Sequence, residues 1–539
     1  MEEVPREGHG PTGLSARIER IITTISPRWG FHRARDRMRI QAAHRLRAMM
    51  SGYRGAKKDR RHSSWLPGSG SADEELLNDL PDLRERSRDL NRNTGAAAGC
   101  TRTAVVNTIG TGIQPQSRLP WEQMNLTEEQ AEALQQQMED VWAEWVRWAD
   151  ASGRQDFYEI QALCDRQWLE SGEFILLRQS IDEPGRPLRF ALQVIEPDRL
   201  ATPTSRRSET AIREGVEIGD RGQPVAYHIR HTHPGDISYG PRGGKAEYER
   251  IAARDDFGSR NIWHCYEVER PGQSRGIPWF APVLANFRGL AEYEEAELMA
   301  ARIAACLALM IESPYDAYAA AEGAAADTKN SQRLEELEPG MIRYLQPGEK
   351  LSSFLPNRPN AQFDPFVKRM LEQLACGLGL PYEVLFQSFA GMNYSNARTA
   401  LLAAYRYFRN RQQFHIRHYC REVWELVMEE AWLRGKLKIP DFARRRRQYV
   451  KMIWIPQGWE WVDPETEVNA AIKAIDANLK SKGEVIAATG RDRDSVFAER
   501  AREKRAEEKL EIAPAEKQPA VRQPSQPAQP QEKTENGGK

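Results

Sequence analysis

Apolar positions recur at helical spacing in several long stretches of the chain. The stretch that follows Thr127 is the clearest, and its apolar positions are Leu134, Met138, Val141, Trp142 and Trp145. Spacings of three and four residues place such side chains on one face of a helix. Thr127 and Gln130 form a capping box, in which each side chain satisfies an early backbone amide. We therefore expect a helix that begins after Thr127 and packs this face into a core.

Strand patterns follow in the middle of the chain. Residues 174–177 form a short apolar run, and residues 188–194 alternate between apolar and polar or small positions before Glu196-Pro197-Asp198. Residues 216–229 are typical of a hairpin that turns at Asp220-Arg221-Gly222. Helices beside strands of this kind predict a mixed α+β domain.

The second half of the chain is dominated by predicted long helices. Residues 281–311 are rich in Ala, Glu and Leu, which favour helix. Asp364 as N-cap and Pro365 at the first helical position open a returning helix. A third helix, residues 397–434, carries many aromatic and arginine side chains. Asp463-Pro464 repeats the cap-and-proline start of an amphipathic helix, and residues 494–510 predict a charged one.

Composition is that of a folded chain with polar ends. The 539 residues are 40% hydrophobic, and 77 basic residues balance 77 acidic residues. Residues 28–61 nevertheless hold twelve Lys or Arg against two acids, so we expect residues 1–70 to be a basic flexible arm. Residues 513–539 are rich in Pro, Gln, Lys and Glu, which predicts disorder. No apolar run approaches the roughly 20 residues of a membrane span, so we expect no membrane contact.

Motifs of enzymes and metal sites are weak. The Gly-x-x-x-x-Gly-Lys-Ser/Thr loop that cradles phosphates is absent, which argues against an ATP-driven motor, and Gly110-Thr111-Gly112 favours a turn. The six cysteines contain no Cys-x-x-Cys pair, and we expect reduced, mostly buried thiols. His228, His231 and His233 favour a surface loop over a metal site. We expect no catalytic residue, no metal and no cofactor.

Two charged motifs near the C-terminus have a structural and a binding interpretation. Asp492 and Asp494 precede an apolar pair and are typical of a helix start, where acids are favourable. Arg444-Arg445-Arg446-Arg447 either binds phosphate or pairs with acids of a neighbouring subunit. The sequence leaves both alternatives open for the four arginines.

Five ordered blocks resemble the lambda-type family of tailed-phage portal proteins, over about residues 75 to 505. The blocks are residues 83–90 with Asn93 and 110–113, residues 196–200, residues 270–278, residues 393–402 and residues 459–464. Ser388, Ala390 and Asn396 depart from the residues that relatives tend to carry. The departures concern one loop and leave the resemblance intact.

The resemblance implies an α+β portal fold with a mixed α/β wing, a helical stem, a small α/β clip and a helical crown. The parts are a wing (71–280), a first stem helix (281–312), a clip (313–362), a second stem helix (363–384), a tunnel loop (385–396), a long helix returning to the wing (397–462) and a crown (463–512). It implies a ring of about twelve copies at one capsid vertex of the virion, assembled in the host cytoplasm. Double-stranded DNA would be packaged and ejected through it. The implied partners are the terminase large subunit, the major capsid protein and the head-tail connector protein.

Two sets of residues are candidates for contact on this interpretation. The channel-loop candidates are Gln387, Ser388, Asn393, Tyr394, Ser395 and Asn396. The candidates for inter-subunit or phosphate contact are Arg398, Arg406, Arg409 and Arg411. The alternative for Asn393-Tyr394-Ser395 is that they only cap the following helix. The alternative functions are a DNA-processing packaging enzyme, or a connector or scaffold protein without a DNA channel.

Overall fold

A computed structural model of the chain describes residues 68–236, 247–306, 310–312, 350–352, 362–460 and 463–509, with residues 28, 32, 35 and 39. The chain divides into two units, Met1–Ser71 and Ala72–Lys539, and nearly all of the described elements belong to the second unit. The predicted basic arm, except for those four positions and residues 68–70, most of the predicted clip and the predicted disordered tail lie outside the described residues.

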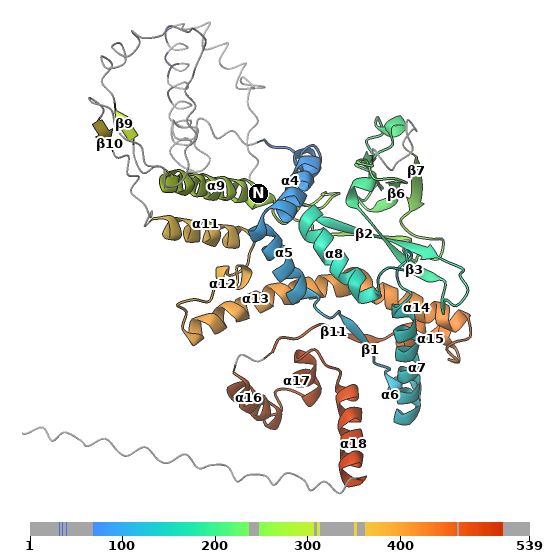
Figure 1. Cartoon of the computed structure of the whole chain (residues 1–539). Helices are drawn as coiled ribbons and strands as arrows, with labels where there is room; N and C mark the ends of the chain where they lie inside the picture. Colours follow the sequence, from blue (N-terminus) through green and yellow to red (C-terminus); the bar gives the residue numbers. More distant parts are fainter. Residues whose placement is uncertain are drawn as a thin grey trace, which may run out of the picture. The chain divides into compact units, whose positions relative to one another are not determined.

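The described part of the second unit starts with six helices, of which α4 and α5 lie against α8 (Figure 1). They are α3 (Ala72–Leu76), α4 (Leu80–Asn93), α5 (Gly95–Thr108), α6 (Trp121–Met124), α7 (Glu128–Val146) and α8 (Phe157–Ser171). The side chain of Thr127 accepts from the amide of Gln130, and the side-chain oxygen of Gln130 accepts from the amide of Thr127. The capping box predicted for α7 is therefore confirmed. Asp156 and Glu159 begin α8 in the same way.

Antiparallel sheets make up the β part of the unit. The order β3-β2-β8 joins Phe190–Ile195, Glu173–Ser180 and Ile262–Tyr266. The order β4-β5-β6-β7 joins Ile212–Arg213, Val216–Ile218, Pro224–Arg230 and Tyr248–Ala252. The order β1-β11 joins Gln114–Ser117 and Met452–Ile455. The predicted strands and the hairpin turning at residues 220–222 are confirmed, as is the α+β fold class.

One long helical path crosses the unit and carries the largest core. It consists of α13 (Tyr394–His415), a π-helical turn (Ile416–Cys420) and α14 (Arg421–Leu433). The helix predicted for residues 397–434 is confirmed, but it begins three residues earlier because Asn393 caps it. Trp424 of α14 packs against Trp142 of α7 with ring centroids 5.4 Å apart, and both belong to the largest apolar cluster.

The predicted stem helices are present with different ends. A 3-10 turn (Ala281–Val283) leads into α9 (Leu284–Cys306), and Met310–Glu312 is strand β9, paired with β10 (Lys350–Ser352). The prediction of helix to residue 311 was therefore wrong. Helix α11 (Phe363–Gly377) runs beside α9 in Figure 1. The prediction that Asp364 caps α11 was also wrong, because Phe363 is already helical and stacks on Tyr293 at 5.8 Å.

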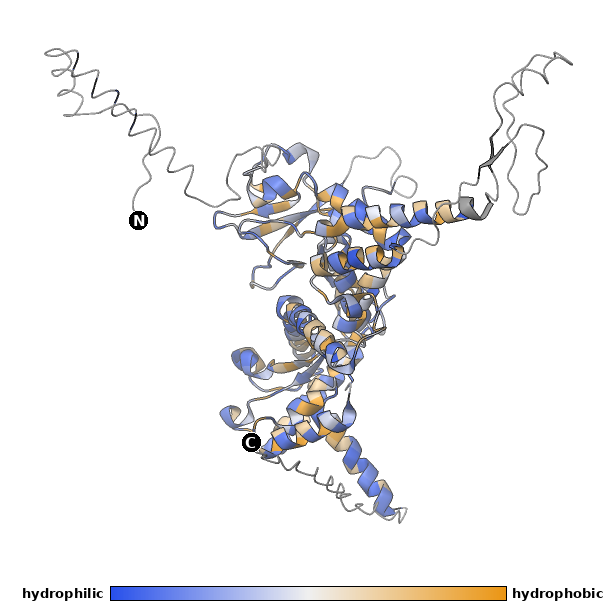
Figure 2. Cartoon of the chain, turned by 90° about the vertical axis from the view of Figure 1, so that its left-hand side faces the viewer, coloured by the Kyte–Doolittle hydropathy of each residue, from blue (hydrophilic) through white to orange (hydrophobic). Residues whose placement is uncertain are grey.

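Three helices close the described chain, namely α16 (Pro464–Asp476), α17 (Lys482–Ala488) and α18 (Arg493–Lys509). Asp463 accepts from the amide of Thr466, which confirms the predicted cap. Figure 2 shows α18 as mostly hydrophilic. None of these three helices contains a buried residue. Among all described helices, none has both the length and the apolar character that a membrane span requires.

Candidate channel loop and its supporting core

The candidate channel loop, residues 386–393, connects α12 (Tyr382–Leu385) to α13. The amide of Ser388 donates to the carbonyl of Glu383 at 2.9 Å, which turns the chain directly after α12. Gln387 has φ of 54° and Gly391 has φ of 77°. A left-handed backbone conformation is energetically unfavourable for a residue with a side chain, such as Gln387, whereas glycine adopts it freely. Main-chain bonds and these two positions therefore fix a compact turn.

Asn393 ends the loop as the N-cap of α13. Its side-chain oxygen accepts from the amide of Asn396 at 2.9 Å. Tyr394, Ser395 and Asn396 form the first turn of the helix instead of extending the loop. Asn393 therefore acts as a helix cap. The side chains of the next three residues are exposed on the first turn of the helix.

The exposed surface at this corner combines polar groups with two aromatic rings. Phe389 is 42% exposed and Tyr394 is 49% exposed. Gln387 is exposed and donates to the hydroxyl of Thr103 at 3.3 Å, whereas Ser388 is half-buried. Exposed aromatic rings beside hydrogen-bonding side chains are typical of a surface that contacts another molecule.

An apolar cluster holds the base of the loop in place. Val384 and Leu385 of α12 are buried together with Ala404 and Phe408 of α13 and Leu380 before α12. Each large side chain buried in this way contributes roughly 1.5–3 kcal/mol. The loop is thus carried between two helices that pack against each other directly.

The candidate arginines of α13 divide between its two faces. Arg398 pairs with Glu467 of α16 at 3.4 Å, and the guanidinium of Arg409 lies 5.5 Å from the ring centroid of Trp459. Arg406 is exposed and has no ion pair with any described residue. Arg398 and Arg409 thus make contacts within the chain at its surface, and Arg406 is the most available cation of this face.

Arg411 lies on the opposite face of α13, so the prediction that it contacts phosphate or another subunit was wrong. It is 6% exposed, its guanidinium pairs with Asp165 of α8 at 2.7 Å, and it stacks over Trp168 at 4.0 Å. A side chain enclosed in this way contacts neither DNA nor another subunit. Its chemistry is used inside the chain, where it joins α13 to α8.

Asp165 completes a buried polar cluster below the long helix. His415 contacts the same carboxylate at 2.9 Å and Tyr419 at 3.2 Å. Burial alone would raise the pKa of Asp165, but the charge of Arg411 and the bonds from His415 outweigh it and lower that pKa. The cluster therefore holds a charged carboxylate in the core and fixes the rotation of α13 against α8.

A second buried cluster is centred on Glu173 at the start of β2. One carboxylate oxygen pairs with Arg84 of α4 at 2.7 Å and with Arg275 at 2.6 Å. The other accepts from the amide of Gly276 at 2.7 Å and contacts His264 of β8 at 3.0 Å. Burial would raise the pKa of Glu173, but Arg275 and Arg84 hold it well below its usual range.

This cluster, the Glu173 joint, connects three of the five ordered motif blocks. Arg84 belongs to the block 83–90, and Arg275 belongs to the block 270–278. Arg275 also donates to the carbonyls of Pro197 at 2.8 Å and Leu200 at 3.0 Å, in the block 196–200. Sequence reasoning did not single out Glu173, although an acid leading a buried apolar strand is a signal that could have found it.

The remaining sequence motifs have structural roles in the described residues. Asp492 accepts from the amide of Ser495 at 2.7 Å, which confirms the predicted helix start. His228 is buried on β6 and contacts Glu217 at 3.3 Å, so the surface-loop prediction was wrong for this histidine. Throughout the described part of the chain, no three His, Cys, Asp or Glu residues gather as metal ligands would. Gly110 and Thr111 lie in a turn, as predicted.

Comparisons with known proteins agree with the ordered motif blocks. The family model described as phage portal protein, lambda family, matches residues 58–412. A probable portal protein of Halomonas phage phiHAP-1 is 29% identical, with 88% of this chain and 90% of that protein covered. Portal protein B of Escherichia phage lambda is 25% identical, with 82% and 86% covered.

Solved structures also align with the chain. A chain from the neck of an empty gene transfer agent particle, computed with C6 symmetry, aligns at 15% identity over 75% of this chain and 93% of its own length, with a TM-score of 0.40. The family model matches well over half of this chain, and the chain therefore belongs to the lambda family of phage portal proteins.

Proposed function

We propose that this chain assembles into a ring of about twelve copies at one vertex of a phage capsid and encloses a channel for double-stranded DNA. In this assignment residues 71–280 form the wing, 281–312 and 363–384 the stem, 313–362 the clip, 385–396 the tunnel loop, 397–462 the return into the wing and 463–512 the crown. The protein acts as a conduit and has no catalytic step of its own. Membership of the portal family supports the proposal.

The single observation that supports a ring most directly is that the last three helices have no buried side chain in the single chain. No side chain of α16, α17 or α18 is buried, and Ile472 and Leu479 are 50% and 78% exposed. Isolated helices shorter than about 12–15 residues are marginal in water, and an amphipathic helix normally gains its stability by burying its apolar face. A neighbouring copy of the same crown would cover that face.

The first stem helix supports the same arrangement. Leu284, Phe287 and Leu290 at its start are buried, whereas none of residues 291–302 is. At 1.5 Å per residue these twelve residues extend about 18 Å beyond the last buried position. This stretch holds four glutamates and a single basic residue, Arg302. A wall with this excess of acid repels phosphates, and DNA would slide past it without being held.

In the particle the ring would contact three kinds of protein in turn. We assign docking of the terminase large subunit during filling, docking of the head-tail connector protein afterwards, and contact with the major capsid protein at the vertex. The resemblance to portal proteins is the basis of these assignments. They place the protein in the virion, after assembly in the host cytoplasm.

Electron microscopy and native mass spectrometry of the purified chain test the ring. We expect closed rings with a central opening, and a monomer that stays monomeric at high concentration would contradict the proposal. Divalent-metal-dependent cleavage of plasmid DNA by the pure protein would support a packaging enzyme instead.

The channel loop is tested separately from the ring. We expect Tyr394→Ala to lower genome filling while rings still form, because its exposed ring lies at the loop. Trp148→Ala is the matched control, since Trp148 is an aromatic residue that is 38% exposed on the turn after α7, outside the loop. Normal filling by the Tyr394 variant would favour a connector whose hole does not handle DNA through this loop.

A further inference from the structure

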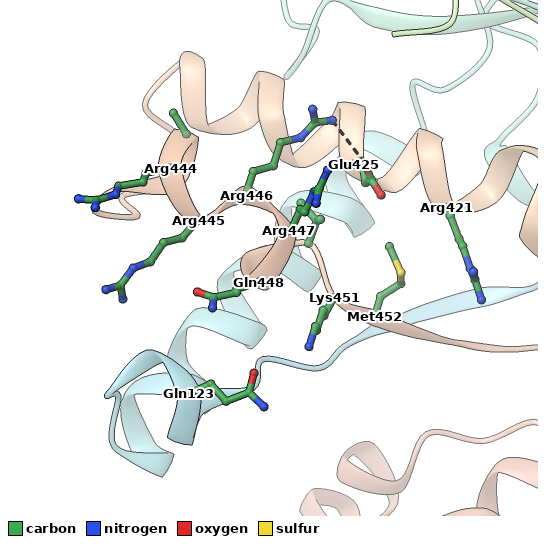
Figure 3. A pocket seen from close by; sticks show the side chains of 12 residues that line it. Gln123, Arg421, Glu425, Arg444, Arg445, Arg446, Arg447, Gln448, Lys451 and Met452 are labelled. Carbon is green, nitrogen blue, oxygen red and sulfur yellow. Dashed lines mark hydrogen bonds and ion pairs between the residues drawn. The ribbon is translucent and has the colours of Figure 1, made fainter. Parts of the chain in front are cut away.

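A cleft of about 1210 Å³ lies between α14, α15 (Phe442–Tyr449) and the chain that leads into β11. Six cationic side chains line it, against one carboxylate, Glu425. The cations are Arg421, Arg444, Arg445, Arg446, Arg447 and Lys451. Figure 3 shows these side chains, which come from separate elements, together with Gln123 and Gln448, which also line the cleft. We call it the arginine cleft.

The local sequence explains why the arginines face outward. Phe442 and Tyr449, at the two ends of α15, are 1% and 3% exposed and belong to the largest apolar cluster. Phe442 stacks on Trp432 of α14 with ring centroids 5.3 Å apart, and the hydroxyl of Tyr449 donates to the carbonyl of Pro440 at 3.2 Å. Because both ends are anchored, the four arginines between them are held at the surface.

Most of the cations in the cleft lack an acidic partner. Arg446 pairs with Glu425 at 3.5 Å and with Glu429 at 3.1 Å. Within the described residues, no carboxylate lies within ion-pairing distance of Arg421, Arg444 or Arg447. The same holds for Lys451 and for Arg445, whose guanidinium donates to the carbonyl of Met124 at 3.4 Å. One arginine of the four is thus neutralised inside the chain.

Concentrating unpaired cations in this way is unfavourable without an anion. Like charges a few ångströms apart repel, and solvent and salt only partly screen them. Over the whole chain acids and bases balance. The excess at this cleft is therefore a local feature, and it creates a strongly positive potential there.

The residue types select the kind of anion. Guanidinium groups bind phosphate or carboxylate through paired hydrogen bonds, and five of the six cations are arginines. The lining holds no aromatic side chain on which a base or an unpaired nucleotide would stack. Duplex DNA hides its bases and presents phosphates. A cleft rich in guanidinium and without a stacking surface fits that backbone.

We propose that the arginine cleft binds the phosphate backbone of duplex DNA as a second contact, apart from the channel loop. The proposal rests on the proposed function, since it concerns the same DNA. Arg421 follows Tyr394 by 27 residues along one nearly continuous helical path, which separates the two places by about 40 Å. In the proposed assignment this path runs from the loop into the wing, so the cleft would hold DNA that is outside the channel.

Covalently closed circular DNA separates the two sites in one assay, because a closed circle cannot thread a closed ring. We would measure its binding to assembled wild-type rings and to the variant Arg444→Ala/Arg445→Ala/Arg447→Ala over a range of salt concentrations. The matched control is Arg147→Ala/Arg207→Ala/Arg221→Ala, which removes three exposed arginines from other elements. All six positions are exposed, so both variants should fold and form rings.

Three lost phosphate contacts should reduce the slope of log affinity against log salt by about 2.7. Between about 50 and 200 mM salt the wild type then loses about 40-fold more affinity than the cleft variant. The control variant should keep the wild-type slope. A cleft variant with the wild-type slope would overturn the proposal.

Competitors separate the remaining occupants of the cleft. Linear duplex should displace the circle, whereas inorganic phosphate should do so only weakly, because it offers a single phosphate. Direct binding of polyglutamate at the cleft, with no measurable affinity for either duplex, would assign the cleft to an acidic protein and overturn the proposal. Imaging the same samples keeps the tests apart, since absent rings contradict the proposed function and intact rings without salt-dependent binding contradict only the cleft.

Discussion

Replacing Glu173 with glutamine should destabilise the protein more than its single lost charge suggests. The carboxylate is fully buried and faces Arg84 and Arg275, whose exposed fractions are 3% and 1%. A buried ion pair adds little net stability, but removing one partner leaves the other buried and uncompensated, at a cost of about 3–5 kcal/mol. Here one substitution leaves two guanidinium groups in that state, so we expect a loss at or above the upper end.

Urea unfolding followed by tryptophan fluorescence, at one protein concentration, measures this loss. The control is Glu209→Gln, which breaks an exposed ion pair with Arg206 at 2.6 Å and should change the midpoint much less. If the Glu173 variant moved the midpoint no more than this control does, the Glu173 joint would not be holding the motif blocks together.

The pH dependence gives an independent check on Glu173. Because Arg275 and Arg84 hold its folded pKa well below the usual range, its contribution to stability is complete above about pH 4.3, where a glutamate of the unfolded chain titrates. The contribution is lost as the pH falls through the folded pKa. The difference in unfolding free energy between wild type and variant should therefore be constant near neutral pH and shrink in acid. A difference that grew on acidification would refute the assigned sign.

Three further substitutions test the supporting structure. Arg411→Ala should lower the free energy of unfolding in urea by about 3–5 kcal/mol, because it leaves the buried carboxylate of Asp165 without its cationic partner. A loss below about 1 kcal/mol would contradict the buried position of Arg411. Asn393→Ala should cost about 0.5–2 kcal/mol through the lost cap, with Asn393→Ser as the control that keeps it. Gly172→Ala should lower the melting temperature sharply, since its φ is 84° and the new Cβ would lie 2.4 Å from the carbonyl carbon of Ile277; an unchanged melting temperature would contradict this geometry.

Local rules were enough to predict most of the helices and strands. The caps at Thr127 and Asp463 depend on residues three positions apart, and the structure has both. The predicted cap at Asp364 was wrong because α11 starts one residue before it, at Phe363, which stacks on Tyr293, a residue distant in sequence. Helix ends that tertiary packing decides are not encoded in neighbouring residues.

In the candidate site, too, local periodicity was informative and contacts between residues far apart in sequence were not predictable. Arg398 and Arg409 are eleven residues apart, which places them about 20° apart around a helix, whereas Arg411 is about 220° from Arg398. On that wheel Arg411 shares the face of Phe408 and His415, which are buried, so the helical period contained the signal. The partners of Glu173 lie about 90 and 100 residues away along the chain. One sequence cannot show which cations reach such an acid.

The central claim is that copies of this chain enclose a passage for DNA, and an electron-microscopy reconstruction of the purified oligomer tests it most directly. We expect a ring with a continuous axial opening wider than a DNA duplex, with α9 and residues 386–396 of every copy turned toward the axis. Separate compact copies, or a ring whose axis protein closes in every state, would contradict the claim.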